Sequence, residues 1–291
     1  MKKYSNVKDF ILKIKELPIL PENIQKINDL INDENTSIEK ITKIVEQDPT
    51  LTLRLLKIAN SAFYGRISKV YTINEALVVV GLANLKSLLL SVFLEQLYNK
   101  NFDDKNILYN LWVHSVFTAL ISTKLIEYYK PEEKEIAYTS GLLHDIGELF
   151  LYKYEFEIYK SILEDIKLED LINRITIEEL YIGFSHCDLG AVVSEYWNLP
   201  KSIKDAIFHH HYNEDFDYNN VLIPVIQLAD ILATKFGIGG TDFYKESSNF
   251  NLLLNKKLID YLGLTSEKID LFSNIVLDIK NNLSSYINSF I

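Results

Sequence analysis

Cysteine, glycine, proline and arginine are all scarce in this chain of 291 residues. A single cysteine, Cys187, excludes an internal disulfide and favours a reducing compartment, so we expect a cytoplasmic protein. Ten glycines and six prolines give few turn signals, which favours helices over many short strands. The first residues are polar with no apolar segment after them, and no run of about 18 apolar residues follows, so we expect neither a secretory signal nor a membrane span.

Basic residues are also in deficit, with 30 lysines and arginines against 40 acidic residues and a net charge of −10. The arginines are Arg54, Arg66 and Arg174. Nucleic acid binding needs a concentrated basic surface, so we expect no nucleic acid partner and no sequence-specific binding of duplex DNA. The same scarcity argues against a broad surface that grips phosphate groups.

Apolar residues recur at helical spacing along almost the whole chain, and this periodicity predicts an all-α protein. We expect helices at about 5–17, 22–32, 38–47, 49–60, 73–80, 84–98, 107–128, 132–151, 155–165, 176–182, 186–197, 201–210, 220–235 and from 250 to the end. Capping-box patterns begin at Thr36, Thr72 and Thr176, Asp48 and Pro49 open a helix, and Gly81 ends one. The polar stretch 101–106 is the best internal boundary.

Ionisable side chains inside these apolar helices are the informative positions, because a buried charge is costly without a partner. Such positions are His114, His144, Asp145, His186 and Asp230. Each alone could be a hydrogen-bonded core residue, but together they are the side chains that bind divalent metals. The run His209, His210 and His211 turns around a helix end, so at most one or two of its members can face one site, and we expect the others to be exposed.

The order His114, His144, Asp145 and Asp230, all on expected helices, resembles the HD superfamily of metal-dependent phosphohydrolases. His186 and His210 match two further histidine positions of some metal-binding members. The N-terminal half resembles the HDOD domain, the HD-related output domain of bacteria. The segments that carry the resemblance are ELPILPENIQKINDLI, VEQDPTLTLRLLKIANSAFYG and INEALVVVGLANLKSLLL. It covers about residues 10–212.

The resemblance implies a two-lobed helical bundle of bacterial signalling, with an N-terminal lobe at about 10–100 and an HD-like lobe from about 107. Residues 213–291 would be a helical extension that completes the HD-like lobe. It also implies a site at His114, His144, Asp145, His186, His210 and Asp230, with a divalent metal (iron, manganese or zinc) as the candidate cofactor. We expect these six side chains to converge in one pocket.

The chain departs from the enzymatic motif at Glu148, where His-Asp-x-Gly is commonly followed by lysine. A lysine near a metal can neutralise a substrate phosphate, whereas a glutamate adds repulsion. If one helix runs through Gly147, Glu148 could orient the imidazole of His144, and the simpler alternative is a solvated Glu148. Lys124, Lys130 and Lys153 are the lysines that could approach the doublet in space.

Two functions remain open, and the first is favoured. The first is a non-catalytic regulatory module that binds a protein partner or a small nucleotide ligand, with Phe63 and Tyr64 as a candidate docking patch or, more simply, core residues. The second is a metal-dependent phosphohydrolase of a nucleotide or cyclic dinucleotide, in which a bound metal would activate a water. Between them lies a metal kept for structure or a ligand sensed without turnover.

Overall fold

The computed structural model describes residues 3–14, 17–31, 33, 36–61, 64, 68–99, 105–165, 174–211, 220–238 and 256–290. Within these ranges the secondary structure is helical and contains no strand, which confirms the predicted all-α class. The chain divides into two compact units, each described by itself below. Unit 1 comprises Met1–Pro18 and Asn101–Ile279, and unit 2 comprises Ile19–Lys100 and Lys280–Ile291.

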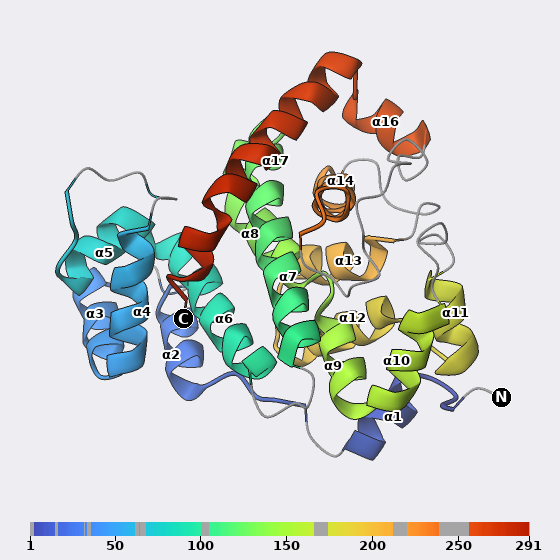
Figure 1. Ribbon diagram of the computed structural model, residues 1–291. Helices are drawn as coiled ribbons and strands as arrows, with labels where there is room; N and C mark the ends of the chain where they lie inside the picture. The colour runs from blue at the N-terminus through green and yellow to red at the C-terminus, as the bar shows by residue number, and fades with distance from the viewer. Residues whose placement is uncertain are drawn as a thin grey trace. The chain divides into compact units, whose positions relative to one another are not determined.

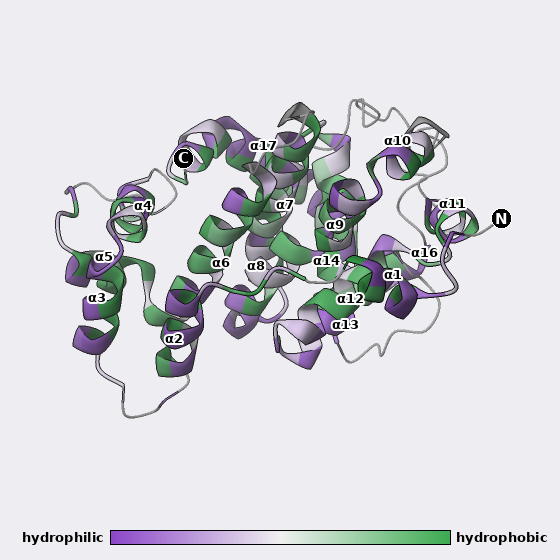
Figure 2. Ribbon diagram, turned by 90° about the horizontal axis from the view of Figure 1, so that it is seen from below, coloured by the Kyte–Doolittle hydropathy of each residue, from purple (hydrophilic) through white to green (hydrophobic). Residues whose placement is uncertain are grey.

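Unit 2 is built from α2 (Glu22–Ile31), α3 (Ile38–Glu46), α4 (Pro49–Ala59), α5 (Ile73–Val80) and α6 (Leu82–Asn99), with the end of α17 (Ser266–Ile287). Its amphipathic helices α2 and α3 each show a hydrophilic and a hydrophobic side in Figure 2. Their apolar sides supply the core, which includes Ile27, Ile41 and Leu55. Periodicity in the sequence therefore corresponds directly to burial in this unit.

Helix ends in unit 2 test the predicted caps. Asp48 accepts hydrogen bonds from the backbone N–H groups of Thr50 and Leu51, so α4 begins as expected. Thr72 begins α5 with a complete capping box, and Gly81 ends it at a φ of 82°. The box expected at Thr36 is wrong, because α3 has its N-cap at Ser37 with no side-chain capping bond.

Unit 1 contains a central group of helices that pack on one another. They are α7 (Lys105–Ile126), α8 (Lys134–Leu143), α9 (Ile146–Tyr154), α12 (His186–Tyr196), α13 (Lys201–His209) and α14 (Leu222–Lys235). Helix α7 packs against α8 and α14, and α12 packs against α9 and α13 (Figure 1). The apolar lining of these contacts includes Trp112, Phe117 and Phe150.

The remaining elements of unit 1 are α1 (Val7–Ile14), the short 3-10 turn η2 (Pro131–Glu133), α10 (Phe156–Asp165), α11 (Arg174–Tyr181) and α16 (Lys256–Leu262). Helix α11 begins two residues before Thr176, so the capping box expected there is also wrong. The single last helix expected from about residue 250 is divided into α16 and α17 at Gly263, whose φ is 58°.

No single helix in the described ranges combines the length and apolar composition of a membrane span. Ile73–Val80 and Asn84–Tyr98 meet those two criteria only as a pair, bent by 106°.

Candidate metal centre

A break between two helices places the His144–Asp145 doublet. The sequence predicts one helix over about 132–151, but α8 ends at Leu143 and α9 begins at Ile146. His144 is the C-cap of α8 and Asp145 the N-cap of α9, and both are buried. On one continuous helix the two side chains would point about 100° apart. The turn between α8 and α9 instead directs both into the same buried region.

Gly147 explains how the doublet approaches the next histidine. A Cβ atom on Gly147 would lie 1.9 Å from the backbone oxygen of His186 and 3.0 Å from the backbone nitrogen of Gly190. Because Gly147 has no side chain, the backbones of α9 and α12 can come into direct contact. His186 is the first residue of α12, held by a capping box between Ser185 and Asp188.

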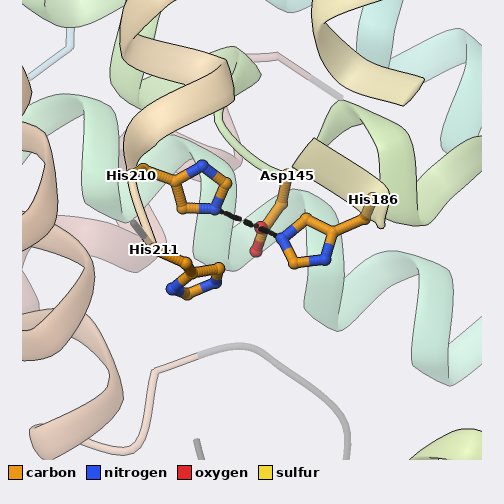
Figure 3. Close-up of side chains that lie close together, drawn as sticks. All are labelled: Asp145, His186, His210 and His211. Carbon is orange, nitrogen blue, oxygen red and sulfur yellow. Dashed lines mark hydrogen bonds and ion pairs between the residues drawn. The ribbon is translucent and has the colours of Figure 1, made fainter. Parts of the chain in front are cut away.

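Asp145 lies between two imidazoles, as Figure 3 shows. Its Oδ1 atom is 3.5 Å from Nε2 of His186 and 3.3 Å from Nε2 of His210. His211 follows at the end of α13, with its ring centroid 4.1 Å from that of His210. Ligand atoms of these four residues lie within 4.8 Å of one another. They form the first ligand group.

A second ligand group comprises His114 of α7, His144 and Asp230 of α14, again with ligand atoms within 4.8 Å of one another. Nε2 of His114 is 3.0 Å from Oδ1 of Asp230, and Nε2 of His144 is 3.7 Å from it. The other oxygen of Asp145, Oδ2, faces this group, 3.1 Å from His144 Nε2 and 3.7 Å from His114 Nε2. Asp145 therefore directs one carboxylate oxygen to each group.

The opposite ring nitrogens settle which imidazole atoms face the centre. Nδ1 of His144 bonds the backbone oxygen of Gly141 at 2.7 Å, and Nδ1 of His210 bonds that of Ile207 at 2.6 Å. A carbonyl oxygen only accepts, so each Nδ1 carries the proton and donates it. In a neutral ring Nε2 is then a bare lone pair, which is the form that binds a metal.

His114 and His186 are oriented in the same way. Nδ1 of His114 lies 3.2 Å from the backbone oxygen of Ile238, and Nδ1 of His186 lies 2.7 Å from the carboxylate of Glu178. Four Nε2 atoms therefore point toward one another and toward two carboxylates. Nε2 of His186 and Nε2 of His210 are only 3.3 Å apart, a contact of two acceptors unless a proton or a cation lies between them.

The pKa shifts at the centre also indicate that it needs a proton or a cation. Burial opposes a charge on His144, but Asp145 and Asp230 outweigh it and raise the pKa of His144 well above its usual value. Burial opposes the carboxylate form of Asp145 and Asp230, but the histidines hold the pKa of both well below the usual range. Burial and His210 lower the pKa of His211. The centre demands positive charge, from protons on the imidazoles or from metal ions.

The side chains fit a divalent metal. Ligands at about 2.0–2.2 Å from an ion stand about 3–3.5 Å from one another, close to the separations found here. Among the described residues, His144 Nε2 and Asp145 Oδ1 are buried without a hydrogen bond of acceptable geometry, although charged neighbours lie nearby. Neutral imidazoles with two carboxylates are ligands that zinc, iron and manganese accept.

The convergence expected from the sequence is thus present for all six residues, and their role as metal ligands stays a prediction. Sequence reasoning missed His211, because a run of three histidines does not reveal which members face inward. The expectation that the rest of the run is exposed is wrong, since His209 and His211 are both half-buried. Cys187 was also missed, with its buried Sγ 3.5 Å from His186 Nε2.

Both readings of Glu148 are wrong. Its side chain is 1% exposed and forms an ion pair with Arg174 of α11, so it neither bonds His144 nor faces solvent. Burial raises the pKa of Glu148 to about 7, and Arg174 opposes this by favouring the charged form. Arg174 is itself buried and also binds Glu178. No local motif predicted the role of Arg174, because Arg174 and Glu148 are separated by 26 positions of sequence.

The lysines expected near the doublet have other neighbours. Lys124 pairs with Glu127 and Lys130 with Glu133, each on a partly exposed surface. Lys153 lies over the ring of Tyr154. Among the described residues, the cation that pairs with Glu148 is Arg174. Of the candidate docking patch, Phe63 lies outside the described residues and Tyr64 is half-buried.

Comparison with known proteins gives a consistent fold. A protein from Geobacter sulfurreducens, described as an HDOD domain protein with unknown function, superposes with a TM-score of 0.78 at 23% identity, over 98% of this chain and 97% of that one. A protein from Shewanella amazonensis SB2B, whose name proposes a phosphohydrolase, gives 0.72 at 20% identity over 97% of both chains. At these identities the likeness establishes the fold.

Sequence comparison identifies the family. An uncharacterized protein of Treponema pallidum (strain Nichols) is 29% identical over 260 residues, which are 88% of this chain. The chain spans about half the length of that curated relative, 48%. The family model of the HDOD domain matches residues 17–213, more than half of the chain. The chain belongs to the HDOD domain family.

Proposed function

We propose that this chain is a regulatory module that holds a divalent metal in the His–Asp centre and acts through binding of a protein or a small ligand, without phosphodiester turnover. Support for the metal comes from the converging Nε2 atoms and the paired carboxylates. Support for a regulatory role comes from membership in the HDOD family and from Glu148.

Glu148 is the observation that carries the non-catalytic part of the proposal. Phosphoryl chemistry needs cationic groups that stabilise charge on the phosphate oxygens in the transition state. At this position the chain has a carboxylate, and that carboxylate pairs with Arg174. Arg174 also pairs with Glu178, so this cation already has two carboxylate partners. A phosphate would have to displace them at the cost of two buried charges.

Metal content and turnover test the proposal on the same preparations. We expect purified wild-type protein to retain at least one equivalent of iron, manganese or zinc by plasma mass spectrometry. Asp145→Ala should retain none, whereas Asp270→Ala, at an exposed position of α17, should match the wild type. Hydrolysis of bis(p-nitrophenyl) phosphate and of a cyclic dinucleotide with added manganese should stay at the rate of Asp145→Ala.

A metal-dependent phosphohydrolase is the second candidate, favoured by one specific observation. Asp145 offers one oxygen to each of two ligand groups, which is how a carboxylate bridges the ions of two-metal hydrolases. Ions bound there would supply Lewis acidity and an activated water. A solved protein of Shewanella amazonensis SB2B with this fold has a name that proposes a phosphohydrolase. A robust manganese-dependent rate that disappears in Asp145→Ala would establish this candidate in place of the first.

A further inference from the structure

A line of buried charged side chains runs from Glu148 through Arg174 and Glu178 to His186. Arg174 is 2% exposed, and its Nε donates to Oε1 of Glu178 at 3.2 Å. Its Nη2 forms the ion pair with Glu148 and donates to the hydroxyl of Tyr159 at 2.6 Å. Helix α11, which contributes Arg174 and Glu178, supplies no ligand to either group of the metal centre. Glu178 contacts the centre directly at His186.

Glu178 holds His186 at two points. Its Oε2 accepts a hydrogen bond from Nδ1 of His186 at 2.7 Å and another from the backbone nitrogen of His186 at 2.8 Å. The first bond fixes the ring and its tautomer, and the second fixes the start of α12. A carboxylate that accepts from Nδ1 also makes Nε2 a more basic metal ligand.

The position of His186 in its helix explains why it needs this partner. His144 and His210 follow the last turns of α8 and α13, so each donates to the carbonyl oxygen three residues earlier. His186 opens α12, so no helical turn precedes it to offer such a carbonyl. The acceptor must come from another element, and α11 supplies it.

Charge balance explains the place of Arg174. Asp145, Glu148, Glu178 and Asp230 are four carboxylates buried around the centre. Without Arg174, Glu148 and Glu178 would be left as neighbouring buried acids, and one of them would protonate or move. Arg174 joins the two by a planar guanidinium that can bind both at once.

We propose that Glu178 and Arg174 are positioning residues of the metal centre: Glu178 fixes the imidazole of His186 with Nε2 toward the ion, and Arg174 fixes Glu178. This rests on the proposed function in so far as that function includes a bound metal. Glu148 stands where the enzymatic motif has lysine. In this proposal it supports the metal site through its ion pair with Arg174 and does not contact a substrate. An ion network that serves only folding is the competing explanation.

The first test measures metal affinity and ligand geometry in Glu178→Gln. Zinc affinity is obtained by competition with a chromophoric chelator, and the cobalt-substituted protein gives a d–d absorption spectrum that reports the ligand field. We expect a 10- to 100-fold loss of affinity, of the size seen for lost partners of metal-bound histidines, together with a changed cobalt spectrum. Glu95→Gln is the matched control, because Glu95 is a buried carboxylate paired with Arg54 in unit 2. It should leave affinity and spectrum unchanged.

The second test separates positioning from folding, and it remains informative if Glu178→Gln fails to fold. Arg174→Met leaves Glu148 buried without its cation, and the double variant Glu148→Met/Arg174→Met removes both charges. We expect the double variant to recover the melting temperature of the metal-free wild type while its zinc affinity stays at least 10-fold weaker, because Glu178 has lost its support. Recovery of both quantities would overturn the positioning role of Arg174.

Two further outcomes would overturn the proposal or the metal centre itself. Equal affinity and superimposable cobalt spectra in wild type and Glu178→Gln would overturn the positioning role of Glu178 while the metal centre itself stands. A wild-type protein that binds neither zinc nor cobalt would overturn the metal centre, and the positioning role with it. The wild-type measurement therefore tells the two failures apart.

Discussion

An ion pair in unit 2 joins the half-buried Arg54 of α4 to the buried Glu95 of α6, with Arg54 Nη1 2.7 Å from Glu95 Oε2. In unit 1 the buried cation Arg174 lies between two carboxylates, and two further carboxylates face histidines. A balanced pair is an ordinary feature of a helical core. An excess of buried carboxylates beside imidazole lone pairs is costly for folding, and such an excess is typical of functional sites. The two units therefore differ in the balance of their buried charges: paired in unit 2, and with an excess of carboxylates over arginine in unit 1.

The largest effect on metal affinity is expected at Asp145, which faces both ligand groups. Asp145→Ala should reduce metal affinity by more than 100-fold, since it removes a carboxylate oxygen from each group. In the metal-free protein it should lower the free energy of unfolding by about 1–3 kcal/mol, because protonated imidazoles lose their acceptor. Chelator competition and urea unfolding measure the two quantities.

Glu95→Ala provides the comparison in unit 2. It should lower the free energy of unfolding by a similar amount and leave metal affinity as in the wild type. Equal losses of metal affinity in both variants would mean that the effect of Asp145 on metal binding is not specific to the unit that contains the ligand groups.

Placing the lysine of the enzymatic motif at residue 148 is expected to lower the stability of the protein and to give no phosphodiesterase activity. Glu148→Lys would place a second cation against Arg174 in a site that is about 1% exposed. Breaking a buried pair in this way costs about 3–5 kcal/mol. Urea unfolding checks the loss, and a manganese-dependent phosphodiesterase assay checks turnover. A stable variant with new activity would show that residue 148 can face a substrate.

Gly147 tests whether the contact of α9 with α12 positions His186. Gly147→Ala should lower the free energy of unfolding by about 1–3 kcal/mol, because its Cβ would lie 1.9 Å from a backbone oxygen that must move. Metal affinity should fall as well, since that oxygen belongs to His186. Thermal unfolding and zinc titration measure both.

Gly263→Ala is the control for this glycine. It has a φ of +58° and no heavy atom within 4 Å of the added Cβ, so only backbone strain of about 1–2 kcal/mol is expected. Its metal affinity should equal that of the wild type. An unchanged affinity in Gly147→Ala would mean that α12 can shift without moving its histidine from the centre.

The sequence predicts the helices well and also the convergence of the six side chains, whose role as metal ligands stays a prediction. Apolar periodicity marks a helix, and an aspartate such as Asp230 within such a helix marks a buried charge with a partner. What failed depends on tertiary structure. The residues between Leu143 and Ile146 include no glycine or proline, and the histidine run does not indicate that His211 joins the first ligand group.

Arg174 and Glu178 were missed for a related reason. The capping pattern at Thr176 was local and plausible, but α11 already includes Arg174, which pairs with Glu178 one turn later. The partners of this pair, Glu148 and His186, come from α9 and α12. Only the packing of α9, α11 and α12 reveals that one of the few arginines pairs with the buried carboxylates of Glu148 and Glu178.

The smallest effect is expected in unit 2, where two helix starts differ only in their caps. Thr72 accepts a hydrogen bond from the backbone nitrogen of Glu75, and the side chain of Glu75 accepts in return from that of Thr72. At Ser37, the N-cap of α3, no side-chain capping bond is present. Thr72→Ala should therefore cost about 1 kcal/mol, and Ser37→Ala only a few tenths.

Chemical denaturation of the two variants measures this difference, with metal affinity as the second quantity. Neither variant should change zinc binding, because neither residue belongs to the unit that contains the ligands. Equal losses for Thr72→Ala and Ser37→Ala would mean that the reciprocal bonds at Thr72 add nothing beyond the preference of a hydroxyl for the N-cap position. A loss at Thr72 that also weakened zinc binding would show that a change in unit 2 reaches the metal centre of unit 1, which a purely local cap cannot do.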